Sequence, residues 1–283
     1  MPGGSRTAID EVRPLEREEF EQIRRLAYET FGLDLRDGKQ DLVCARLRRL
    51  VISRGCHSYE EYYRRVLADR TQAELSAMID ALTTNHTSFL REAEHFRYLR
   101  ETVVPQLAGR GRIDVWSAAC ATGEEVWSLV FLLDEALPGR TVRVVGTDIS
   151  SRALAQARLA RYPAERVSGL PREWRERYLE REHGEPQSWY QVARPYRARA
   201  EFTRLNLMDR ISWPRPFPVV FCRNVMIYFD KPTQERVVAK LAAAVEPGGY
   251  LFVGHAESLT GVRHWLEYQR PAVYRKPVER LRK

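Results

Sequence analysis

Short apolar runs alternate with longer amphipathic segments after about residue 110, and this alternation constrains the fold most strongly. Residues 113–116 and 141–146 have the apolar character of buried strands. Residues 124–136 and 151–161 follow them with the apolar spacing of helices. Strand, helix, strand and helix at this spacing predict parallel βαβ units, and therefore an α/β domain built on an open sheet.

The same alternation returns near the end of the chain. Residues 219–222 predict a strand, residues 233–245 a helix and residues 250–254 a further strand. The stretch between the two α/β parts, residues 163–200, is less regular and rich in Arg, Glu and Pro. We expect its segments 189–192 and 196–202 to form a small antiparallel piece inserted in the α/β domain.

The first part of the chain has a different pattern. Residues 15–82 carry apolar side chains at helical spacing in four successive stretches, and Gly32 and Gly55 end the first two. The run Ser58-Tyr59-Glu60-Glu61 has the form of a capping box that opens the third. Short connections between four helices predict a small helical bundle.

Composition narrows the class of protein. A hydrophobic content of 44% and a charged content of 30% are typical of a globular protein. No window approaches the roughly 20 apolar residues of a membrane span, and the first residues show no secretory signal. We therefore expect a cytoplasmic protein without direct membrane insertion. The net charge of +8 favours polyanionic partners but does not choose among nucleic acid, lipid and acidic protein surfaces.

Cysteine and histidine spacing predicts no metal site. The four cysteines form no CxxC pair, and Cys120 and Cys222 lie in apolar runs, as buried thiols in a reducing compartment do. His86 has no second His or Cys at metal-ligand spacing.

Polar residues stand where the predicted strand 219–222 ends. Arg223 and Asn224 follow the apolar run at once, and more apolar residues come after them. A strand that stops on polar side chains is typical of the ligand-binding edge of an open α/β sheet. An ordinary left-handed or capping Asn is the alternative for Asn224.

The segment between the first strand and its helix, residues 117–125, points to a cationic ligand. Its small residues allow close approach to the backbone, and Gly123 allows a tight turn. A phosphate cradle would have more glycines and no acids at the helix start, whereas Glu124 and Glu125 stand there. Both acids could equally be first-turn residues that favour the helix dipole.

An acid also stands at the end of the second predicted strand. Asp148 stands roughly 20–25 residues after the glycine turn. An acid at this position typically holds a nucleotide ribose through its hydroxyl groups. The alternative is a helix N-cap, for which Asp148 or Ser150 would serve. Together with the acidic turn, this favours a nucleoside with an amine-bearing tail and no phosphates, which describes S-adenosylmethionine.

Two further segments are candidates for the same site. Residues 83–92 place six polar residues before Phe-Leu-Arg at the junction of the two predicted domains, although a polar capping run is the alternative. Residues 254–259 directly follow a predicted strand. Two interpretations are open for them: they line the same edge of the sheet, or they form a plain loop.

These segments, in this order, resemble the chemotaxis receptor methyltransferase family, CheR. The resemblance runs from about Phe20 to Tyr274 and rests on five motifs: TTNHTSFLRE, WSAACATGEE, GTDIS, FCRNVMIYFDKPTQ and PGGYLFVGHAESL. It implies an all-helical domain, residues 15–85, before a class I S-adenosylmethionine methyltransferase domain, residues 86–276. The small antiparallel β-subdomain would cover about 178–203.

The resemblance also implies an activity and a set of site residues. The activity is methyl transfer from S-adenosylmethionine to glutamate side chains on the cytoplasmic helical domain of chemoreceptors, which leaves S-adenosylhomocysteine. Glu125 would meet the amino group of the methionine part and Asp148 the ribose. Arg91 and Tyr228 would lie near the transferred methyl group as catalytic residues. The remaining cofactor contacts carried over by motif are Asn85, Thr87, Asn206, Leu207, Asn224 and Val225, with Arg91 contacting the cofactor as well.

Some positions depart from the family pattern. Leu90 stands where a second Phe is usual, and Ala121 and Ala256 replace serines. Members that tether to a receptor's C-terminal pentapeptide share a GxGxxxG-type loop, whereas residues 179–192 here contain only Gly184. We therefore expect this protein not to bind that pentapeptide.

The chain shows how such an enzyme would meet its substrate. A glutamate carboxylate is ionised at neutral pH and needs no general base, so orientation by Arg91 would matter most. Arg46, Arg48 and Arg49 project from one predicted helix and would dock acidic receptor surfaces. We expect the protein to be a monomer.

Two alternative functions remain. A methyltransferase for small molecules or nucleic acid is one alternative, although no RNA-binding signature is visible. A non-catalytic module that binds the cofactor as a signal is another.

Overall fold

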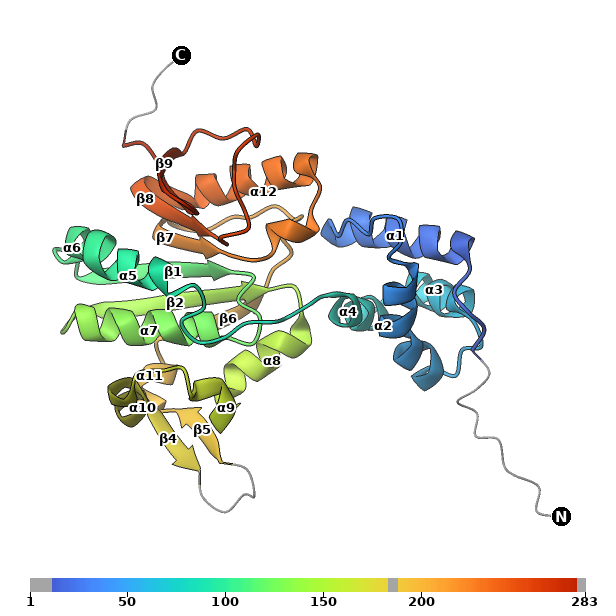
Figure 1. Cartoon of the computed structure of the whole chain (residues 1–283), viewed down its shortest axis with the longest axis horizontal. Helices are drawn as coiled ribbons and strands as arrows, with labels where there is room; N and C mark the ends of the chain where they lie inside the picture. Colours follow the sequence, from blue (N-terminus) through green and yellow to red (C-terminus); the bar gives the residue numbers. More distant parts are fainter. Residues whose placement is uncertain (1–11, 183–187, 279–283) are drawn as a thin grey trace. The chain divides into compact units, whose positions relative to one another are not determined.

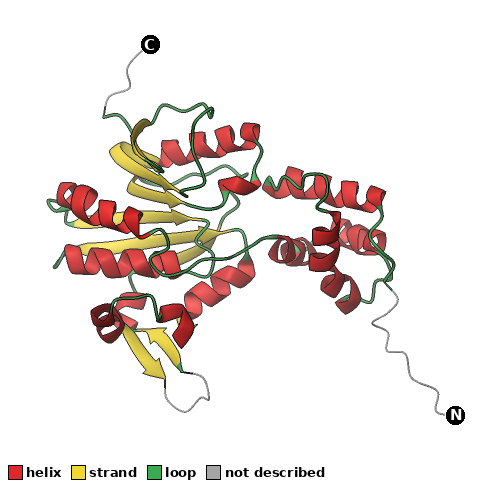
Figure 2. Ribbon diagram, in the orientation of Figure 1, coloured by secondary structure: helices red, strands yellow, loops and turns green. Residues whose placement is uncertain are grey.

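The computed structural model describes residues 12–182 and 188–278. The chain divides into two compact units, residues 1–84 and residues 85–283. Figures 1 and 2 show a helical unit and a unit of mixed helices and strands. Among the described residues, no helix is both long enough and apolar enough to span a membrane.

From residue 12 onward, where the structure describes it, the first unit contains four helices, as the apolar spacing predicted. They are α1 (Arg17–Phe31), α2 (Gln40–Ser53), α3 (Tyr59–Ala68) and α4 (Ala73–Leu82). Gly32 ends α1 in the left-handed region, with φ 74°, where a residue without Cβ is least strained. The Ser58 side chain accepts a hydrogen bond from the Glu61 backbone N–H at 3.1 Å and caps α3. Buried Ile23, Leu47 and Met78 form part of the core of this unit.

The second unit is built on a seven-stranded sheet with the order β6-β2-β1-β7-β8-β10-β9. Its parallel part contains β1 (Arg112–Ala118), β2 (Thr141–Asp148), β6 (Ala200–Arg204), β7 (Phe217–Cys222) and β8 (Val245–Val253). β10 (Val273–Arg275) and β9 (Glu267–Arg270) continue the sheet in antiparallel pairing. This is the α/β architecture that the sequence pattern predicted.

Helices cover both faces of this sheet. On one face Val115, Val144 and Phe221 pack in a cluster with α7 (Glu124–Ala136) and the helical segments α5 (Ala93–Tyr98), η2 (Leu99–Val103) and α6 (Val104–Leu107). On the other face Trp116 and Val220 pack with α12 (Lys231–Ala244). Neighbouring strand residues thus bury opposite faces, as the period of a strand requires. The segment 93–107 was not predicted as helical.

A smaller sheet stands apart from the main one. Its order is β3-β5-β4, and it contains β3 (Arg161–Pro163), β5 (Trp189–Val192) and β4 (Leu179–Glu182) in antiparallel pairing. The helix α8 (Ser151–Leu159) ends before it at Ala160, which has φ 52°. Short helices α9 (Ala164–Val167), α10 (Arg172–Tyr178) and α11 (Arg194–Arg197) complete this region.

The prediction that residues 196–202 belong to the small antiparallel piece was wrong. Residues 200–204 form β6, which pairs in parallel with β2 at the edge of the main sheet. The register sets Phe202 opposite Gly146, and a Cβ at Gly146 would lie 2.8 Å from the Phe202 ring. The missing side chain at Gly146 therefore accommodates Phe202, whose ring also packs against Trp127.

Candidate functional site

Loops that follow four strands of the main sheet converge at its carboxyl edge. The Asp148 side chain at the end of β2 accepts a hydrogen bond from the Ala121 backbone N–H at 2.8 Å, in the loop after β1. The Asp148 carbonyl accepts a second from the Leu205 N–H at the end of β6. Arg223, after β7, reaches Glu125 at the start of α7. In a parallel sheet this edge is the usual ligand site.

The backbone of these loops is strained. Eight described residues other than glycine have a positive φ, and five of them lie in the segments that meet here, with φ between 48° and 62°. Such conformations disfavour residues with a Cβ and cluster at functional sites. The five are Leu90, Glu92, Ala119, Ala121 and Asn224.

Glu125 is buried at the first turn of α7 and keeps capacity for a ligand. One carboxylate oxygen accepts from the Ser117 hydroxyl at 2.7 Å, and the other accepts from Arg223 at 2.9 Å. A carboxylate offers about four lone-pair sites, so both oxygens can accept a further hydrogen bond. These acceptor oxygens suit a ligand ammonium group, the role that the sequence analysis expected for Glu125.

Arg223 connects the parts of the site, and the sequence analysis assigned it no role. Its guanidinium group, with 2% of the side chain exposed, lies between Glu92 and Glu125 at 2.9 Å from each. It also donates to the backbone carbonyl of Arg91. Two rings, Phe96 and Phe221, flank it within 6 Å. Arg223 therefore holds the Arg91 backbone and Glu125 in one rigid arrangement.

Of the two residues that the sequence offered as the N-cap of the helix after β2, Ser150 takes that position. Ser150 is the N-cap of α8, because its hydroxyl accepts from the Ala153 N–H at 3.0 Å. Asp148 accepts from the Ser150 and Ala121 backbone N–H groups. The Asn85 amide donates to the Ser150 hydroxyl at 3.1 Å. The structure thus brings Asn85 next to the strand end that carries Asp148.

The remaining residues of the segment 85–92 approach the edge in different ways. Thr87 is buried. The Arg91 side chain is half-buried and donates to the His86 carbonyl at 2.8 Å. This bond folds Arg91 back on its own loop.

Asn206 and Leu207 follow β6 directly. The Asn206 side chain accepts from the Met208 N–H at 3.0 Å, which orders the turn, and Leu207 is buried. Because the neighbouring Leu205 N–H bonds the Asp148 carbonyl, this turn lies beside the end of β2.

Asn224 has the left-handed backbone that the alternative interpretation proposed, with φ 59°. Its side-chain amide donates to Glu92 at 3.1 Å, and its backbone N–H donates to Glu257 at 2.7 Å. Glu257 also accepts from the backbone N–H groups of Gly254, Met226 and Ile227. The segment 254–259 therefore lines the same edge and is not a plain loop.

Two of these carboxylates have shifted proton affinities. Burial raises the pKa of Glu257, although the four backbone N–H donors oppose that effect. Burial also acts to raise the pKa of Glu92, but the Arg223 charge and the hydrogen bonds of Arg223 and Asn224 outweigh it and lower that pKa. Glu92 is thus held as a carboxylate.

Tyr228 ends the short helix η3 (Met226–Tyr228), which follows Val225. Both Tyr228 and Val225 are half-buried, and Ile227 between them is exposed. Within the described part of the chain, no hydrogen bond joins the Tyr228 hydroxyl to the Arg91 side chain. The two predicted catalytic residues thus lie on different loops, with no hydrogen bond between them in the described part of the chain.

The three arginines predicted to dock a substrate differ from one another. In the helical unit Arg46 is half-buried, and it donates to the Leu82 carbonyl and to the Thr84 hydroxyl. Arg48 is half-buried as well, whereas Arg49 is exposed. Arg49 is thus the member of the set best placed to meet an external charge.

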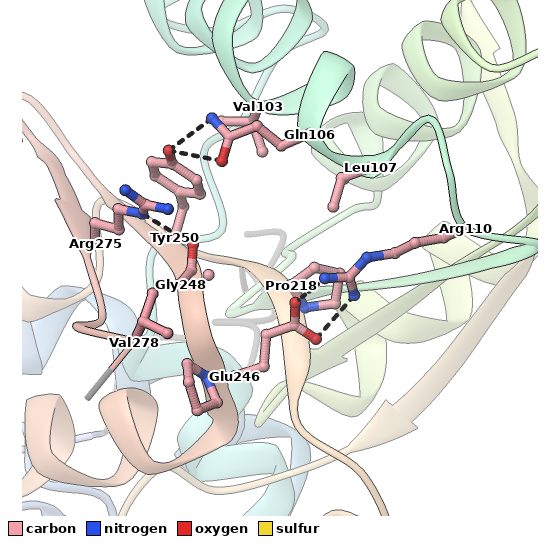
Figure 3. A pocket seen from close by; sticks show the side chains of 12 residues that line it. Val103, Gln106, Leu107, Arg110, Pro218, Glu246, Gly248, Tyr250, Arg275 and Val278 are labelled. Carbon is pink, nitrogen blue, oxygen red and sulfur yellow. Dashed lines mark hydrogen bonds and ion pairs between the residues drawn. The ribbon is translucent and has the colours of Figure 1, made fainter. Parts of the chain in front are cut away.

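A separate cavity of about 210 Å³ lies near the amino ends of β7 and β8, away from the carboxyl edge (Figure 3). Its polar side chains are occupied with one another. Arg110 is paired with Glu246, and Tyr250 is hydrogen-bonded to Gln106. None of the residues predicted to bind the cofactor lines this cavity.

Two family models and a set of curated relatives match the chain. The model described as the CheR methyltransferase SAM-binding domain matches residues 85–274, and the all-alpha domain of the same family matches residues 18–83. A chemotaxis protein methyltransferase of Borreliella burgdorferi is 32% identical over 92% of this chain and 94% of its own length. Chemotaxis protein methyltransferase 2 of Pseudomonas aeruginosa is 36% identical over 91% of this chain and 92% of its own. The chemotaxis protein methyltransferase of Klebsiella aerogenes is 37% identical over 92% of this chain and 90% of its own.

Proposed function

Because the chain belongs to the CheR methyltransferase family, we propose that it methylates glutamate side chains of chemoreceptor cytoplasmic domains, forming glutamyl methyl esters. Its class, a methyltransferase that uses S-adenosylmethionine, follows from the family. The observation that carries the proposal is the Arg223 ion-pair network, which ties Glu125 and the Arg91 backbone together at the carboxyl edge of the sheet. This network supports the proposal because it links Glu125, which would bind the amino group, to the loop that carries Arg91.

The residues of the site suit this cofactor and this reaction. S-adenosylmethionine, when bound, supplies an electrophilic methyl group whose bond to sulfur breaks as a substrate carboxylate oxygen bonds the carbon. Glu125 would hold the amino group, Asp148 the ribose, and the turn at Asn206 and Leu207 would flank the adenine. The remaining predicted contacts, Asn85, Thr87, Asn224 and Val225, would enclose the same ligand.

No proton has to be moved in this reaction. A free glutamate side chain has a pKa near 4.3, so it meets the methyl group already ionised. Arg91 would orient that carboxylate after leaving its bond to the His86 carbonyl. Tyr228 would contact the reacting groups from the opposite loop. Rate enhancement would then come from alignment and from the exclusion of water.

The direct test uses labelled S-adenosylmethionine and a cytoplasmic helical fragment of a chemoreceptor. We expect label on the fragment that base releases as methanol, because carboxyl methyl esters hydrolyse readily in base. The Asp148→Ala variant should bind the cofactor more weakly and transfer less label. Base-stable label on the fragment would indicate methylation of nitrogen and would contradict the proposal.

The same experiment separates the alternative functions. A signalling module would bind S-adenosylmethionine or S-adenosylhomocysteine in calorimetry without transferring label. A methyltransferase for small molecules or nucleic acid would transfer label only when those substrates replace the receptor fragment.

We also propose that receptor methylation here does not depend on a C-terminal pentapeptide. The proposal rests on the sequence of residues 179–192, and residues 183–187, including Gly184, lie outside the described part of the chain. Calorimetry with a receptor-tail peptide should show no binding, and micromolar affinity would overturn this point. The enzyme would act in the cytoplasm as a monomer, which light scattering of the purified chain would check.

A further inference from the structure

Three potential metal ligands meet beside the site, and the proposed reaction gives them no role. Glu92 precedes α5, His95 lies within α5, and His255 follows β8. One nitrogen from each histidine and one carboxylate oxygen lie within 4.8 Å of one another. Sequence spacing predicted no metal, because about 160 residues separate His255 from the other two.

His95 is the unusual member of this cluster. It is 1% exposed, and neither of its ring nitrogens has a hydrogen-bond partner among the described residues. A buried polar group without a partner is destabilising by about 1–3 kcal/mol, so such a group calls for an explanation. An imidazole nitrogen without a hydrogen-bond partner can serve as a ligand for a metal ion.

One pair of the ligand atoms has the spacing expected around a tetrahedral ion, and the three ligand atoms all lie within 4.8 Å of one another. His95 Nδ1 lies 3.4 Å from a Glu92 carboxylate oxygen, which is longer than an ordinary hydrogen bond. Two ligands bound tetrahedrally to zinc at 2.0–2.1 Å are separated by about 3.3 Å. His255 is exposed, and its ring lies 4.6 Å from that of His95 between centroids. An ion can therefore reach the buried ligands from the His255 side.

We propose that Glu92, His95 and His255 form a binding site for Zn²⁺ with a fourth position left for water. Two imidazoles and one carboxylate are a ligand set that zinc commonly takes. Arg223 opposes the ion, because it contacts the same Glu92 oxygen at 2.9 Å, and Arg270 adds positive charge nearby. Glu92 and Glu125 partly offset these charges, so the affinity should be below that of closed structural zinc sites.

The test is zinc binding by the untagged, full-length, metal-free protein in calorimetry. His255→Ala is the informative variant, since this exposed side chain can be removed without opening the core. We expect its Zn²⁺ affinity to fall by roughly 100-fold or more, because loss of even an outer-sphere partner reduces affinity 10–100-fold. His57→Ala is the matched control, as His57 is an exposed histidine in the helical unit, and its affinity should equal that of the unchanged protein.

Cobalt gives a second readout that does not involve methyl transfer. Co²⁺ should produce the visible absorption of a tetrahedral ion in the unchanged protein and in His57→Ala, but not in His255→Ala. Absence of zinc binding in the unchanged protein, or equal binding by both variants, would overturn the proposal. Neither result depends on whether the chain methylates receptors.

Discussion

At the scale of single residues, a buried arginine organises the site. Arg223 has two carboxylate partners, a backbone carbonyl acceptor and two aromatic neighbours. In a chain this rich in arginine, nothing in the sequence marked it as buried. Its partners lie 98 and 131 positions away, and such distances leave no local pattern. By contrast, Glu125 and Asp148 could be predicted because each stands at a strand-to-helix junction.

Replacing Arg223 tests this organising role. Arg223→Met should destabilise the fold by about 3–5 kcal/mol, because it leaves the buried Glu125 and the half-buried Glu92 without their cation. Urea unfolding of the full chain measures this change. The control is Arg172→Ala, which removes an exposed helix ion pair with Glu176 and should change stability by roughly 0.5 kcal/mol or less. Similar losses of unfolding free energy in the two variants would contradict the organising role of Arg223.

Arg91 should matter for the reaction more than for cofactor binding. Among the described residues, its side chain has one hydrogen-bond partner, the His86 carbonyl, so a substrate carboxylate has a single bond to displace. Arg91→Ala should lower kcat more than it raises the Kd for S-adenosylmethionine. Steady-state kinetics and calorimetry on the same preparation provide the two values. If kcat and the affinity for S-adenosylmethionine fall by the same factor, Arg91 does not act mainly by orienting the substrate.

At the scale of elements, local patterns predicted some boundaries and missed others for physical reasons. The helix 124–136 and the strand 189–192 have the predicted bounds, because each has clear stop signals in its own sequence. The edge strand β6 was placed in the wrong sheet, since its parallel partner β2 lies more than 50 positions earlier. The segment 93–107 was missed because its helical turns are short and interrupted by η2.

The pairing of β6 with β2 can be tested at one glycine. In Gly146→Ala the new Cβ would lie 2.8 Å from both the Phe202 ring and the Val126 side chain. Overpacking of this kind should destabilise the protein by about 1–3 kcal/mol. Gly111→Ala is the control, because a Cβ there meets nothing within 4 Å. If thermal or urea unfolding shows the same stability for Gly146→Ala and Gly111→Ala, the result would contradict the pairing of β6 with β2.

The connection between α3 and α4 should make the helical unit sensitive to acid. Asp69 accepts from the Glu74 N–H and from Thr71, and these hydrogen bonds lower its pKa to about 2. The folded-state pKa lies below the unfolded value near 4, so this stabilisation is full above pH 4 and is lost as pH falls toward 2. Urea midpoints measured between those pH values should fall more for the unchanged protein than for Asp69→Asn. Parallel pH profiles would show that Asp69 makes no such contribution.

At the scale of the whole molecule, the two-part organisation followed from the change in periodicity near residue 110. The family models match one part each, at residues 18–83 and 85–274. The helical unit carries nine basic and five acidic residues between positions 36 and 70. This excess supports the proposal that the helical unit meets an acidic receptor surface.

Salt dependence tests that docking role. Methylation of a receptor fragment should slow as ionic strength rises, because screening weakens attraction between exposed charges. Arg49→Ala should show a lower rate at low salt and a shallower salt dependence. The control is Arg172→Ala, which removes one positive charge as Arg49→Ala does, but from the methyltransferase unit. Its methylation rate and salt dependence should equal those of the unchanged enzyme. If the two variants show the same salt dependence of the methylation rate, Arg49 is not part of the docking surface.

Mass spectrometry of a receptor fragment after incubation with S-adenosylmethionine would show whether the chain methylates glutamate. We expect a single added methyl group on particular glutamate side chains, present with the unchanged enzyme and much reduced with Arg91→Ala. Methyl groups found on lysine or arginine nitrogen, or an unmodified fragment despite measurable cofactor binding, would contradict the proposed function.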